Sequence, residues 1–351
     1  MGIRVGHWDD WPLEGLLRQK AATGQRVSLV VPARNEAATV GAVVTRVREA
    51  LMDTVTLVDE VVVIDSDSVD DTYAVAESAG ARVHRAADIR PDLGSHPGKG
   101  EAMWKSLFVT SGELVVFMDA DLHDWDTHFV PGLLGPLLHH SEIQLVKGFY
   151  DRPGADGPLE GGRVTELVAR PLIALLFPEL DGLVQPLAGE WAVRRSWFAG
   201  LCVPTGYAVE LAALVDTVRA AGPAALAQVD LGVRAHRHQA LRDLGGMATQ
   251  IIAAALARTS PEVSRLVAGA PRTSTTGGLV AGAPRTSTTG GLVAGAPRTS
   301  TTGGLVAGAP RSSTIGDDTG EAVVLRQYLR GLEPVERVVP IYERPAAKGW
   351  L

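Results

Sequence analysis

Two aspartates one residue apart, Asp119 and Asp121, come directly after the apolar segment 114–118. If the backbone turns there, their carboxylates can share a divalent cation, directly or through water. Mg²⁺ or Mn²⁺ held in this way would neutralise a nucleotide diphosphate and support it as a leaving group. The same pair also occurs at ordinary strand-ending turns, so the metal hypothesis depends on where the preceding segment lies in the fold.

A second acidic segment, residues 65–71, reads Asp-Ser-Asp-Ser-Val-Asp-Asp. An EF-hand calcium loop would need Asp or Asn at its fifth position and glycine at its sixth, where this segment has Val69 and Asp70. Calcium binding is therefore disfavoured, and part of the segment is expected to cap a helix. Asp65 and Ser66 could in addition contact a base or a ribose.

Two glycine-containing segments each precede a helical pattern. In residues 97–101 the glycines let the backbone approach a ligand and Lys99 can meet a phosphate, but a helix-capping turn explains the segment equally well. It is not a P-loop, because the longer Gly-x-x-x-x-Gly-Lys-Ser/Thr pattern is missing. In residues 161–166 free amides, Arg163 and Thr165 would converge on an anion, and a capped helix with a solvated arginine is the alternative.

Several further polar residues have no role that spacing alone can assign. His236 and His238 would point to one face only if their segment is a strand. Glu190, Glu210 and Tyr207 stand alone in the pattern, so they enter the argument only through a resemblance.

Strands and helices that alternate along the chain must position these segments. Short apolar runs predict strands, and apolar residues with helical spacing predict helices between them. The expected strands are 27–33, 60–65, 81–84 and 114–118, and the expected helices are 39–52, 70–79, 99–110, 164–177, 211–219 and 244–258. The pattern is typical of an α/β fold with a mostly parallel sheet and helices on both faces. Ligands bind such sheets at the carboxyl ends of the strands, where most of the polar residues above lie.

Composition limits the class of partner. The 351 residues carry a net charge of −7, whereas a duplex-binding surface would bring a basic excess, so we expect no nucleic-acid partner. The single cysteine, Cys202, excludes an intrachain disulfide and suits a reducing compartment. With no secretory pattern at the N-terminus and no apolar run of about 18 residues, a cytoplasmic protein without membrane association is expected.

The chain divides into four segments. Residues 1–26 form an N-terminal segment, and residues 27–260 hold the alternating pattern. Residues 266–317 repeat a unit of 13 residues rich in Gly, Pro, Ser and Thr, which predicts disorder or a flexible linker, although identical repeats can also stack into a solenoid. Residues 318–351 return to a mixed composition and are expected to form a helix and a strand that dock on the core.

Six stretches, in order along residues 27–258, are similar to the actinobacterial glucosyl-3-phosphoglycerate synthases, and Gly-Gly-Arg-Val-Thr-Glu is the most distinctive of their motifs. The stretches are residues 32–40, 64–72, 97–107, 119–122, 161–172 and 231–237. The resemblance implies a GT-A nucleotide-diphosphosugar transferase fold (a Rossmann-like sheet) and a homodimer. It also implies transfer of glucose from UDP-glucose to the 2-hydroxyl of 3-phosphoglycerate with retention of configuration.

The resemblance implies a role for each matching residue. The nucleotide sugar would be held by Pro32, Ala33, Glu36, Ser66, Lys99, Asp119, Ala120, Tyr207 and Glu210. The metal, Mg²⁺ or Mn²⁺, would be held by Asp119, Asp121 and His236. The acceptor 3-phosphoglycerate would be bound by Gly162, Arg163 and Thr165, and catalysis would be carried by Asp121, Glu210 and Arg163.

The chain departs from the family pattern beside the expected sugar site. It has Ala188, Ala208 and Ala212 where the family usually has glycine, and the extra methyl groups would narrow the sugar pocket. A mannosyl-3-phosphoglycerate synthase that uses GDP-mannose therefore stays open. A polyprenyl-phosphate glycosyltransferase is a further alternative, but it predicts membrane association, which the hydropathy does not support. From another class, an inactive core could display the repeats as an interaction module. A nucleotidyltransferase would need a glycine-rich loop after the first strand, where this chain has Pro-Ala-Arg-Asn-Glu.

Retention of the sugar's configuration by double displacement would need a carboxylate nucleophile. No such carboxylate stands out in the motifs, which favours front-face attack within a tight ion pair.

Overall fold

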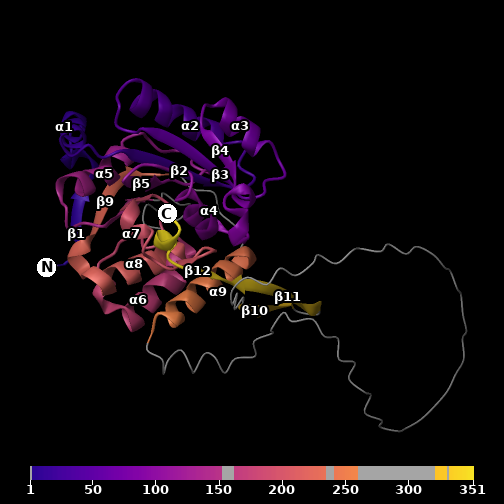
Figure 1. Ribbon diagram of the computed structural model, residues 1–351. Helices are drawn as coiled ribbons and strands as arrows, with labels where there is room; N and C mark the ends of the chain where they lie inside the picture. The colour runs from indigo at the N-terminus through magenta and orange to yellow at the C-terminus, as the bar shows by residue number, and fades with distance from the viewer. Residues whose placement is uncertain (1, 152–161, 235–240, 260–320, 330–331) are drawn as a thin grey trace, which may run out of the picture.

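The computed structural model of the chain describes residues 2–151, 162–234, 241–259, 321–329 and 332–351. An eight-stranded sheet lies between two layers of helices (Figure 1). Only β7 runs antiparallel to its neighbours, β5 and β6, and the other neighbouring strands pair in parallel. In sheet order the strands are β1 (Arg4–His7), β9 (Leu226–Val233), β6 (Leu145–Asp151), β7 (Trp191–Arg194), β5 (Leu114–Phe117), β2 (Val27–Ala33), β3 (Glu60–Asp65) and β4 (Arg82–Arg85). The expectation of a mostly parallel α/β sheet is confirmed.

The inner strands are buried on both faces, as their nearly continuous apolar sequences require, whereas the edge strands β1 and β4 are partly exposed. In β2, Leu29 and Val31 pack into the core on one face of the sheet, while Val30 between them packs into the core on the other face. β3 divides in the same way, with Val63 on the first face and Val62 on the second. Alternation with a period of two therefore builds two apolar cores from one sheet.

Each core is covered by its own layer of helices. The first layer comprises α1 (Leu13–Thr23), α2 (Val40–Arg48), α3 (Thr72–Ser78) and α5 (Phe129–His139). The second layer comprises α4 (Lys99–Ser106), α6 (Arg170–Leu176), α7 (Arg195–Phe198), α8 (Val209–Ala221) and α9 (Leu241–Ala257). Short helical turns join these elements: η1 (Trp8–Asp10), η2 (Glu49–Asp53), η3 (Ala86–Asp88), η4 (Pro91–Leu93), η5 (Thr165–Ala169), η6 (Pro178–Leu180), η7 (Pro223–Ala225) and η8 (Ala347–Gly349).

The expected elements and the observed ones agree closely in the first half of the chain. The strands expected at 27–33 and 60–65 are β2 and β3, residue for residue. The helix expected at 164–177 differs, because the π-helical turn η5 occupies residues 165–169 and regular α-helix resumes at α6. Pro171 at the start of α6 lacks an N–H, so it cannot donate the hydrogen bond that a continuous α-helix would need there.

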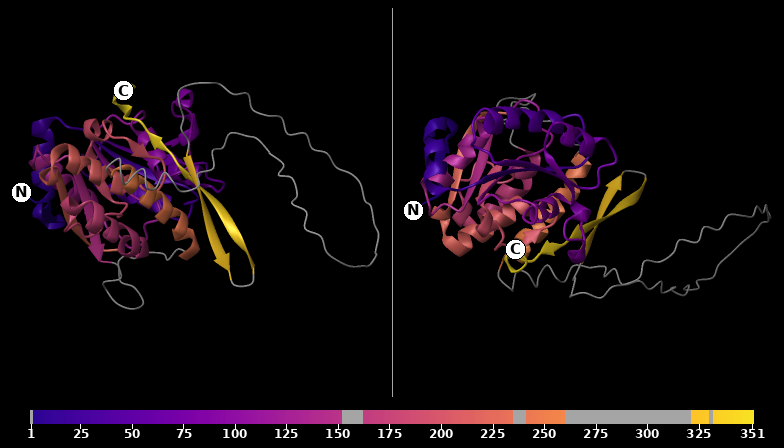
Figure 2. Two further views of the ribbon diagram at one scale, coloured as in Figure 1. Left: turned by 90° about the horizontal axis from the view of Figure 1, so that it is seen from below. Right: turned by 45° about the horizontal axis from the view of Figure 1, so that its top comes forward.

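The two ends of the chain depart from a simple division into a core and flanking segments. At the N-terminus, β1 pairs with β9 and extends the central sheet. At the C-terminus, β10 (Glu321–Leu329) and β11 (Leu332–Ile341) form an antiparallel hairpin that extends away from the sheet (Figures 1 and 2). The helix expected in this part was wrong, because the β-branched valines at positions 323, 324, 335, 338 and 339 favour strands. The strand β12 (Glu343–Arg344) then pairs with β8 (Val203–Pro204).

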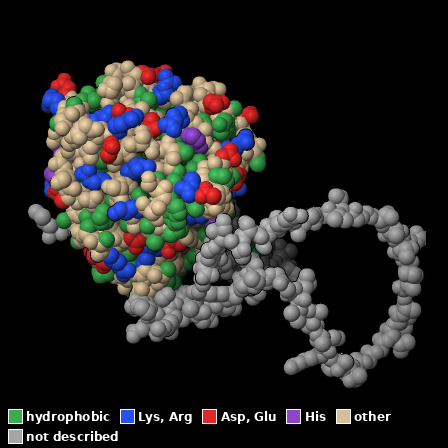
Figure 3. Space-filling model, in the orientation of Figure 1, with side chains coloured by type: hydrophobic (Ala, Val, Ile, Leu, Met, Phe, Trp, Pro, Cys, Tyr) green, Lys and Arg blue, Asp and Glu red, His purple; other side chains and the backbone are tan. Residues whose placement is uncertain are grey.

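The repeat tract at 266–317 and His236 lie outside the described residues, so the expectations about them remain predictions. Among the helices that the structure describes, none is long and apolar enough to cross a membrane. The described surface in Figure 3 interleaves basic, acidic and apolar side chains, without a broad basic field on that face.

Candidate functional site

A lysine bridges two carboxylates at the carboxyl end of the central strands. Lys99 Nζ lies 2.6 Å from Asp119 Oδ1 and 2.7 Å from Glu210 Oε1. Asp119 follows β5, Lys99 begins α4 and Glu210 lies in the first turn of α8, so three separate elements meet at one ammonium group. Burial disfavours the charge on Lys99, but the two carboxylates outweigh this effect and hold the lysine pKa well above its usual value.

Glycines beside Lys99 allow this convergence. Gly98 has a φ of +135°, and a Cβ on Gly100 would lie 1.9 Å from the carbonyl oxygen of Pro204. A side chain at either position is therefore excluded by backbone conformation or by space. The close approach lets the backbone N–H groups of Gly100 and Glu101 donate to the carbonyls of Gly206 and Thr205, at 3.2 and 2.9 Å. The glycines thus join the start of α4 to the segment that leads into α8.

The pKa values of the two paired aspartates shift in opposite directions. Burial favours the neutral acid at Asp119, yet the nearby cations, Lys99 first and then Arg234, together outweigh it and lower the pKa of Asp119 to about 2. Burial and the neighbouring Asp119 carboxylate both raise the pKa of Asp121. Gly189 leaves the space that Asp119 occupies, because a Cβ there would lie within 2.3 Å of three atoms of the aspartate side chain. One carboxylate is therefore held in its charged form by cations, while burial and its neighbour favour the neutral form of the other.

A buried arginine, Arg234, lies next to the two aspartates. Arg234 Nη1 lies 2.9 Å from Glu190 Oε1 and donates to the Tyr150 hydroxyl at 2.6 Å, while Nη2 lies 3.3 Å from Asp121 Oδ1. The Tyr150 hydroxyl in turn donates to Glu190 Oε2 at 2.9 Å. Burial opposes the charge on Arg234, but Glu190, Tyr150 and the two aspartates together outweigh it and raise the arginine pKa. The guanidinium thus orients Asp121 from a fixed position in the core.

A second lysine near the site, Lys147, is located in β6 and is buried. Its ammonium donates to the Ala188 carbonyl and lies 5.8 Å from the centre of the Trp191 ring. Burial lowers the pKa of Lys147 to about 8, while the Glu210 carboxylate acts in the opposite direction. The electrostatic influence of Glu210 shows that Lys147 belongs to the same charged group.

Glu36 completes the acidic side of the site. It follows β2 in a loop where Asn35 adopts a φ of +58°, a conformation that asparagine tolerates. The loop is held by the Ser68 and Thr72 hydroxyl oxygens, which accept from the backbone N–H groups of Asn35 and Glu36 at 2.9 and 2.7 Å. Burial first, and then the Asp121 carboxylate, raise the pKa of Glu36 to about 7.

The charges of this group fit a bound dication. The charged group comprises five carboxylates, those of Glu36, Asp119, Asp121, Glu190 and Glu210, and three cations, Lys99, Lys147 and Arg234. Five against three leaves an excess of two negative charges, which accounts for part of the raised pKa values of Glu36 and Asp121. No three His, Cys, Asp or Glu side chains of the described residues form a complete metal cage. Mg²⁺ commonly uses one or two carboxylates with substrate phosphates and waters, so the aspartate pair suits it.

Other residues expected to hold the nucleotide sugar surround this group. Ser66 lies next to the end of β2, where its backbone N–H donates to the Ala33 carbonyl at 2.9 Å, and Pro32 precedes Ala33 in the same strand. Ala120 is buried between the two aspartates. Tyr207 is 46% exposed, and its backbone N–H donates to Gln250 Oε1 of α9 at 3.0 Å, so its ring is accessible to a ligand.

The residues expected to bind the acceptor lie on a different element. The Gly162 carbonyl accepts from Glu166 N–H at 3.0 Å, Arg163 is exposed, and Thr165 is buried at the start of η5. η5 packs against α9, the helix that also contacts Tyr207. α9 therefore links this segment to Tyr207.

Sequence reasoning missed Lys147, Arg234 and Tyr150 and gave no role to Glu190. A signal was present for Lys147, since it is a lone charge inside the apolar run of β6, where an unpaired lysine would be costly. Arg234 and Glu190 gave no such signal, because their pairing depends on β9 lying close to β7, which the order of the sequence does not show.

The alanines that replace family glycines are buried. Ala188 packs into one core and Ala208 into the other, and Ala212 is only 2% exposed. The expectation that their methyl groups narrow the sugar pocket stays a prediction.

Comparison with known proteins agrees with the family resemblance found in the sequence. The sequence model of glycosyl transferase family 2 matches residues 28–197. The chain is 48% identical over 252 residues to the glucosyl-3-phosphoglycerate synthase of Mycolicibacterium smegmatis, a match that covers 71% of this chain and 82% of the relative. The crystal structure of the Mycobacterium tuberculosis glucosyl-3-phosphoglycerate synthase in complex with Mn²⁺, UDP-glucose and phosphoglyceric acid superposes with a TM-score of 0.73, 37% sequence identity and 99% coverage of both chains. The same enzyme with Mn²⁺, UDP and glucosyl-3-phosphoglycerate also gives 0.73 and 37%, with 99% of this chain and 100% of the other covered.

Proposed function

Because this chain belongs to the glucosyl-3-phosphoglycerate synthases, a family with the GT-A fold, we propose that it transfers glucose from UDP-glucose to the 2-hydroxyl of 3-phosphoglycerate and retains the configuration of the sugar. The observation that carries the proposal is the Lys99 bridge between Asp119 and Glu210, with Asp121 beside it. This cluster lies at the strand ends where such sheets bind nucleotides.

The nucleotide occupies the ends of β2 and β3 in this proposal. Pro32 and Ala33 line the uracil and ribose side together with Ser66, whose backbone is hydrogen-bonded to the end of β2. Glu36 lies between that region and the aspartates. Lys99 contacts the diphosphate with an ammonium that is charged at neutral pH, because the two carboxylates hold its pKa high.

Mg²⁺ or Mn²⁺ belongs at Asp119 and Asp121, with His236 as a further ligand. Such an ion neutralises the diphosphate leaving group. The chain's own contribution is to hold Asp121 in place through Arg234 and to balance Asp119 through Lys99. The excess of two negative charges in the group supports this assignment, and so does the Mn²⁺ in the complexes of the M. tuberculosis relative.

The sugar lies between Glu210 and Tyr207 in this proposal. Glu210 is buried and held by Lys99, so its carboxylate accepts from glucose hydroxyls in a fixed direction. The two buried carboxylates of the charged group, Glu210 and Glu190, are each paired with a cation. Neither is placed as a free nucleophile, which supports front-face attack by the acceptor hydroxyl on the same side as the leaving phosphate.

Gly162, Arg163 and Thr165 bind the acceptor. An acceptor with both a phosphate and a carboxylate suits a guanidinium with five donors beside a hydroxyl and helix-terminal amides. The phosphoglyceric acid in the crystal structure of the relative supports an anionic acceptor of this size.

Incubation of the purified protein with UDP-glucose, 3-phosphoglycerate and Mg²⁺ tests the proposal directly. We expect UDP release that depends on 3-phosphoglycerate, and a product whose anomeric proton shows the α configuration in NMR. GDP-mannose added in competition should leave the rate nearly unchanged. UDP release that needs no 3-phosphoglycerate, or preferential use of GDP-mannose, would contradict the proposal and favour one of the alternative donors or acceptors.

A homodimer and a cytoplasmic location remain part of this proposal. They rest on the family resemblance and on the single cysteine, Cys202, which suits a reducing compartment. Light scattering of the purified protein would measure its mass in solution, and a mass of one chain would contradict the dimer.

A further inference from the structure

The last ten residues of the chain, 342–351, run across the second helical layer and are called the C-terminal strap here. Within the strap, β12 pairs antiparallel with β8, so that Arg344 lies opposite Val203. Thr205 N–H then donates to the Tyr342 carbonyl at 2.9 Å. The strap therefore forms an edge along the segment that leads to Glu210.

Arg344 is the buried charge of the strap. Its Nε and Nη2 atoms each donate to one oxygen of Glu101 at 2.7 Å, and the residue is 8% exposed. The same guanidinium donates to the carbonyls of Leu93 at 2.6 Å and Gly94 at 3.2 Å, and it lies 4.8 Å above the Trp104 ring. A planar guanidinium that donates two parallel hydrogen bonds to one carboxylate fixes the orientation of the two side chains as well as their distance.

Glu101 connects this arginine to the candidate site. It lies two residues after Lys99 in the first turn of α4, and its own side chain is 1% exposed. Its backbone N–H donates to the Thr205 carbonyl at 2.9 Å. Arg344 thus holds α4 through its side chain, while its strand holds the segment 203–206 that α4 contacts.

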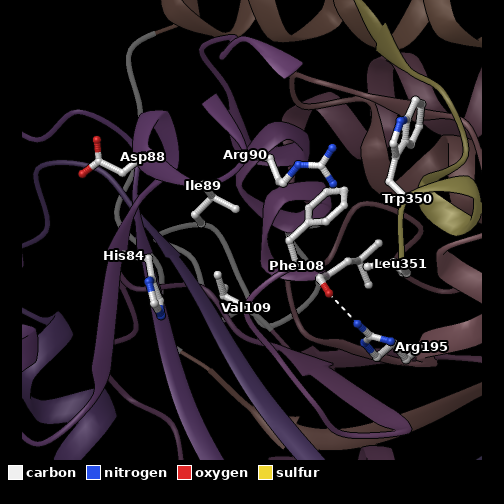
Figure 4. A pocket seen from close by; sticks show the side chains of 10 residues that line it. His84, Asp88, Ile89, Arg90, Phe108, Val109, Arg195, Trp350 and Leu351 are labelled. Atoms are coloured by element: carbon white, nitrogen blue, oxygen red, sulfur yellow. Dashed lines mark hydrogen bonds between the residues drawn. The ribbon is translucent and has the colours of Figure 1, made fainter. Parts of the chain in front are cut away.

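The rest of the strap is seated on the same helix. Trp104 Nε1 donates to the Pro345 carbonyl at 2.9 Å, and the ring of Trp350 packs edge-on against Trp104 at 6.1 Å. Figure 4 shows Trp350 and Leu351 on the opposite side of a hollow from His84, with Phe108 between. The strap therefore runs from the start of α4 to its end.

We propose that Arg344 is a positioning residue for the nucleotide-sugar site. Through Glu101 it sets the place of Lys99, and through the pairing of β12 with β8 it sets the segment that carries Glu210. The Lys99 ammonium can then reach Asp119 and Glu210 at the same time. A buried ion pair is a poor source of stability compared with apolar packing of equal volume, so a fork at this place suits a directional role. The inference rests on the proposed function for its kinetic measurement.

The test compares UDP binding and kinetics in Arg344→Lys and Glu101→Gln. Arg344→Lys keeps the charge but not the fork, so the Kd for UDP measured by calorimetry should rise about tenfold or more, the scale of one lost charge-assisted contact. The KM for UDP-glucose should rise with it, while the KM for 3-phosphoglycerate stays within about twofold, below the resolution of one contact. Because both variants break one pair, the double variant should lose no more than the worse single variant.

Arg194→Lys is the matched control. Arg194 is also an arginine that donates to backbone carbonyls, those of Leu137, His140 and Ile143, but it lies at the opposite end of β7 from the aspartates. This control should lower the melting temperature and leave the Kd for UDP unchanged. If Arg344→Lys does not fold, Glu101→Gln alone decides the question, because it keeps the size of the side chain.

The proposal is overturned if the variants bind UDP as wild type does, or if Arg194→Lys weakens UDP binding as much as Arg344→Lys. Wild-type protein assayed in parallel separates the two proposals. Wild type that transfers no glucose contradicts the proposed function, whereas unchanged UDP affinity in the variants contradicts only the role of Arg344.

Discussion

The two halves of the central sheet supply the charges of the site in different ways. On the side of β2, β3 and β5, the polar residues follow the strands in short consecutive motifs, and several remain partly exposed, as Glu36 and Asp121 do. On the side of β6, β7 and β9, single charges in or next to different strands meet inside the core, where Arg234, just after β9, pairs with Glu190, just before β7. The first half presents groups to a ligand, and the second half holds those groups in place from behind.

The difference shows what local sequence can encode. A motif after a strand can be recognised because parallel strands bring their carboxyl ends to one edge. A pair such as Arg234 and Glu190 becomes visible only when the strand order is known, since 44 positions separate the two residues. Four predictions test whether the halves really divide the work, from the largest expected effect to the smallest.

Lys99→Met should have the largest effect, because Lys99 is the residue through which the first half meets the sugar site. The change leaves Asp119 and Glu210 facing each other without the ammonium between them. We expect kcat/KM to fall about 10³-fold, equivalent to about 4 kcal/mol. Steady-state kinetics with both substrates measures it.

Lys20→Met is the control for that prediction. Lys20 is also largely buried and paired, 2.8 Å from Asp59 Oδ2, but Asp59 accepts from the first residue of β2 at the other end of the strand. The control should reduce stability and spare kcat/KM. Equal losses of kcat/KM in the two variants would show that any buried lysine pair supports activity. That result would contradict a specific role for Lys99 in the site.

Arg163→Ala asks whether the acceptor is bound outside both halves. We expect acceptor use to weaken by about 2–4 kcal/mol, the scale for losing a charge-assisted contact, with donor binding nearly unchanged. Arg163→Lys should also be impaired, because an ammonium cannot reproduce the planar fork. Acceptor-dependent kinetics beside calorimetry with UDP-glucose would show the split.

Arg170→Ala provides the comparison for the acceptor test. Arg170 begins α6 directly after η5 and is paired with Glu166 at 2.8 Å, so it shares the surroundings of Arg163 without belonging to the acceptor motif. Its replacement should leave the KM for 3-phosphoglycerate unchanged. If Arg163→Ala lost donor affinity instead and kept its acceptor KM, the cluster would belong to the nucleotide.

Glu36→Gln should reveal, as a pH-dependent gain in stability, the cost of burying the Glu36 carboxylate and of placing it near Asp121. The pKa of Glu36 is raised to about 7 in the fold, so the folded protein binds a proton that the unfolded chain has released between about pH 4.5 and 7. Stability contributed by this proton is present below pH 4.5 and is lost as the pH rises through 7. Without metal or UDP, the variant should therefore be more stable than wild type above pH 7 by about 1–2 kcal/mol, a figure reduced for partial exposure.

Urea unfolding at several pH values measures this difference. The gain should vanish near pH 4.5, because both folded and unfolded wild type then carry the proton. A variant that is less stable than wild type above pH 7 would mean that Glu36 is stabilised as a carboxylate, in opposition to the raised pKa.

Deletion of residues 279–304 should have the smallest effect. It removes two whole repeat units and keeps their phase. The elements on either side, α9 and β10, are held by contacts of their own with the core and with β11. We expect kcat/KM to change less than about tenfold, or 1.4 kcal/mol, and a greater fall would show that the tract supports the site.

The sequence could predict the fold and the site residues that follow β2, β3 and β5, because both depend on local patterns. Apolar runs of strand length placed β2 and β3 residue for residue, because strands buried on both faces are continuously apolar. The C-terminal hairpin was not anticipated, since a helix was expected where valines favour strands. Arg344 could not have been found, because its partner Glu101 lies 243 positions away. The resemblance supplied the substrates, which neither spacing nor periodicity could have identified.

The dependence of UDP binding and turnover on a divalent cation tests most directly the claim that Asp119 and Asp121 hold a metal ion beside the nucleotide. UDP binding is measured by calorimetry with and without Mn²⁺, in wild type and in Asp121→Asn, beside turnover in excess EDTA. The excess of negative charge around Asp119 and Asp121 predicts that Mn²⁺ strengthens UDP binding in wild type but not in the variant, and that EDTA abolishes turnover. Full turnover in excess EDTA, or equal UDP affinity with and without Mn²⁺ in wild type, would contradict the account of this site.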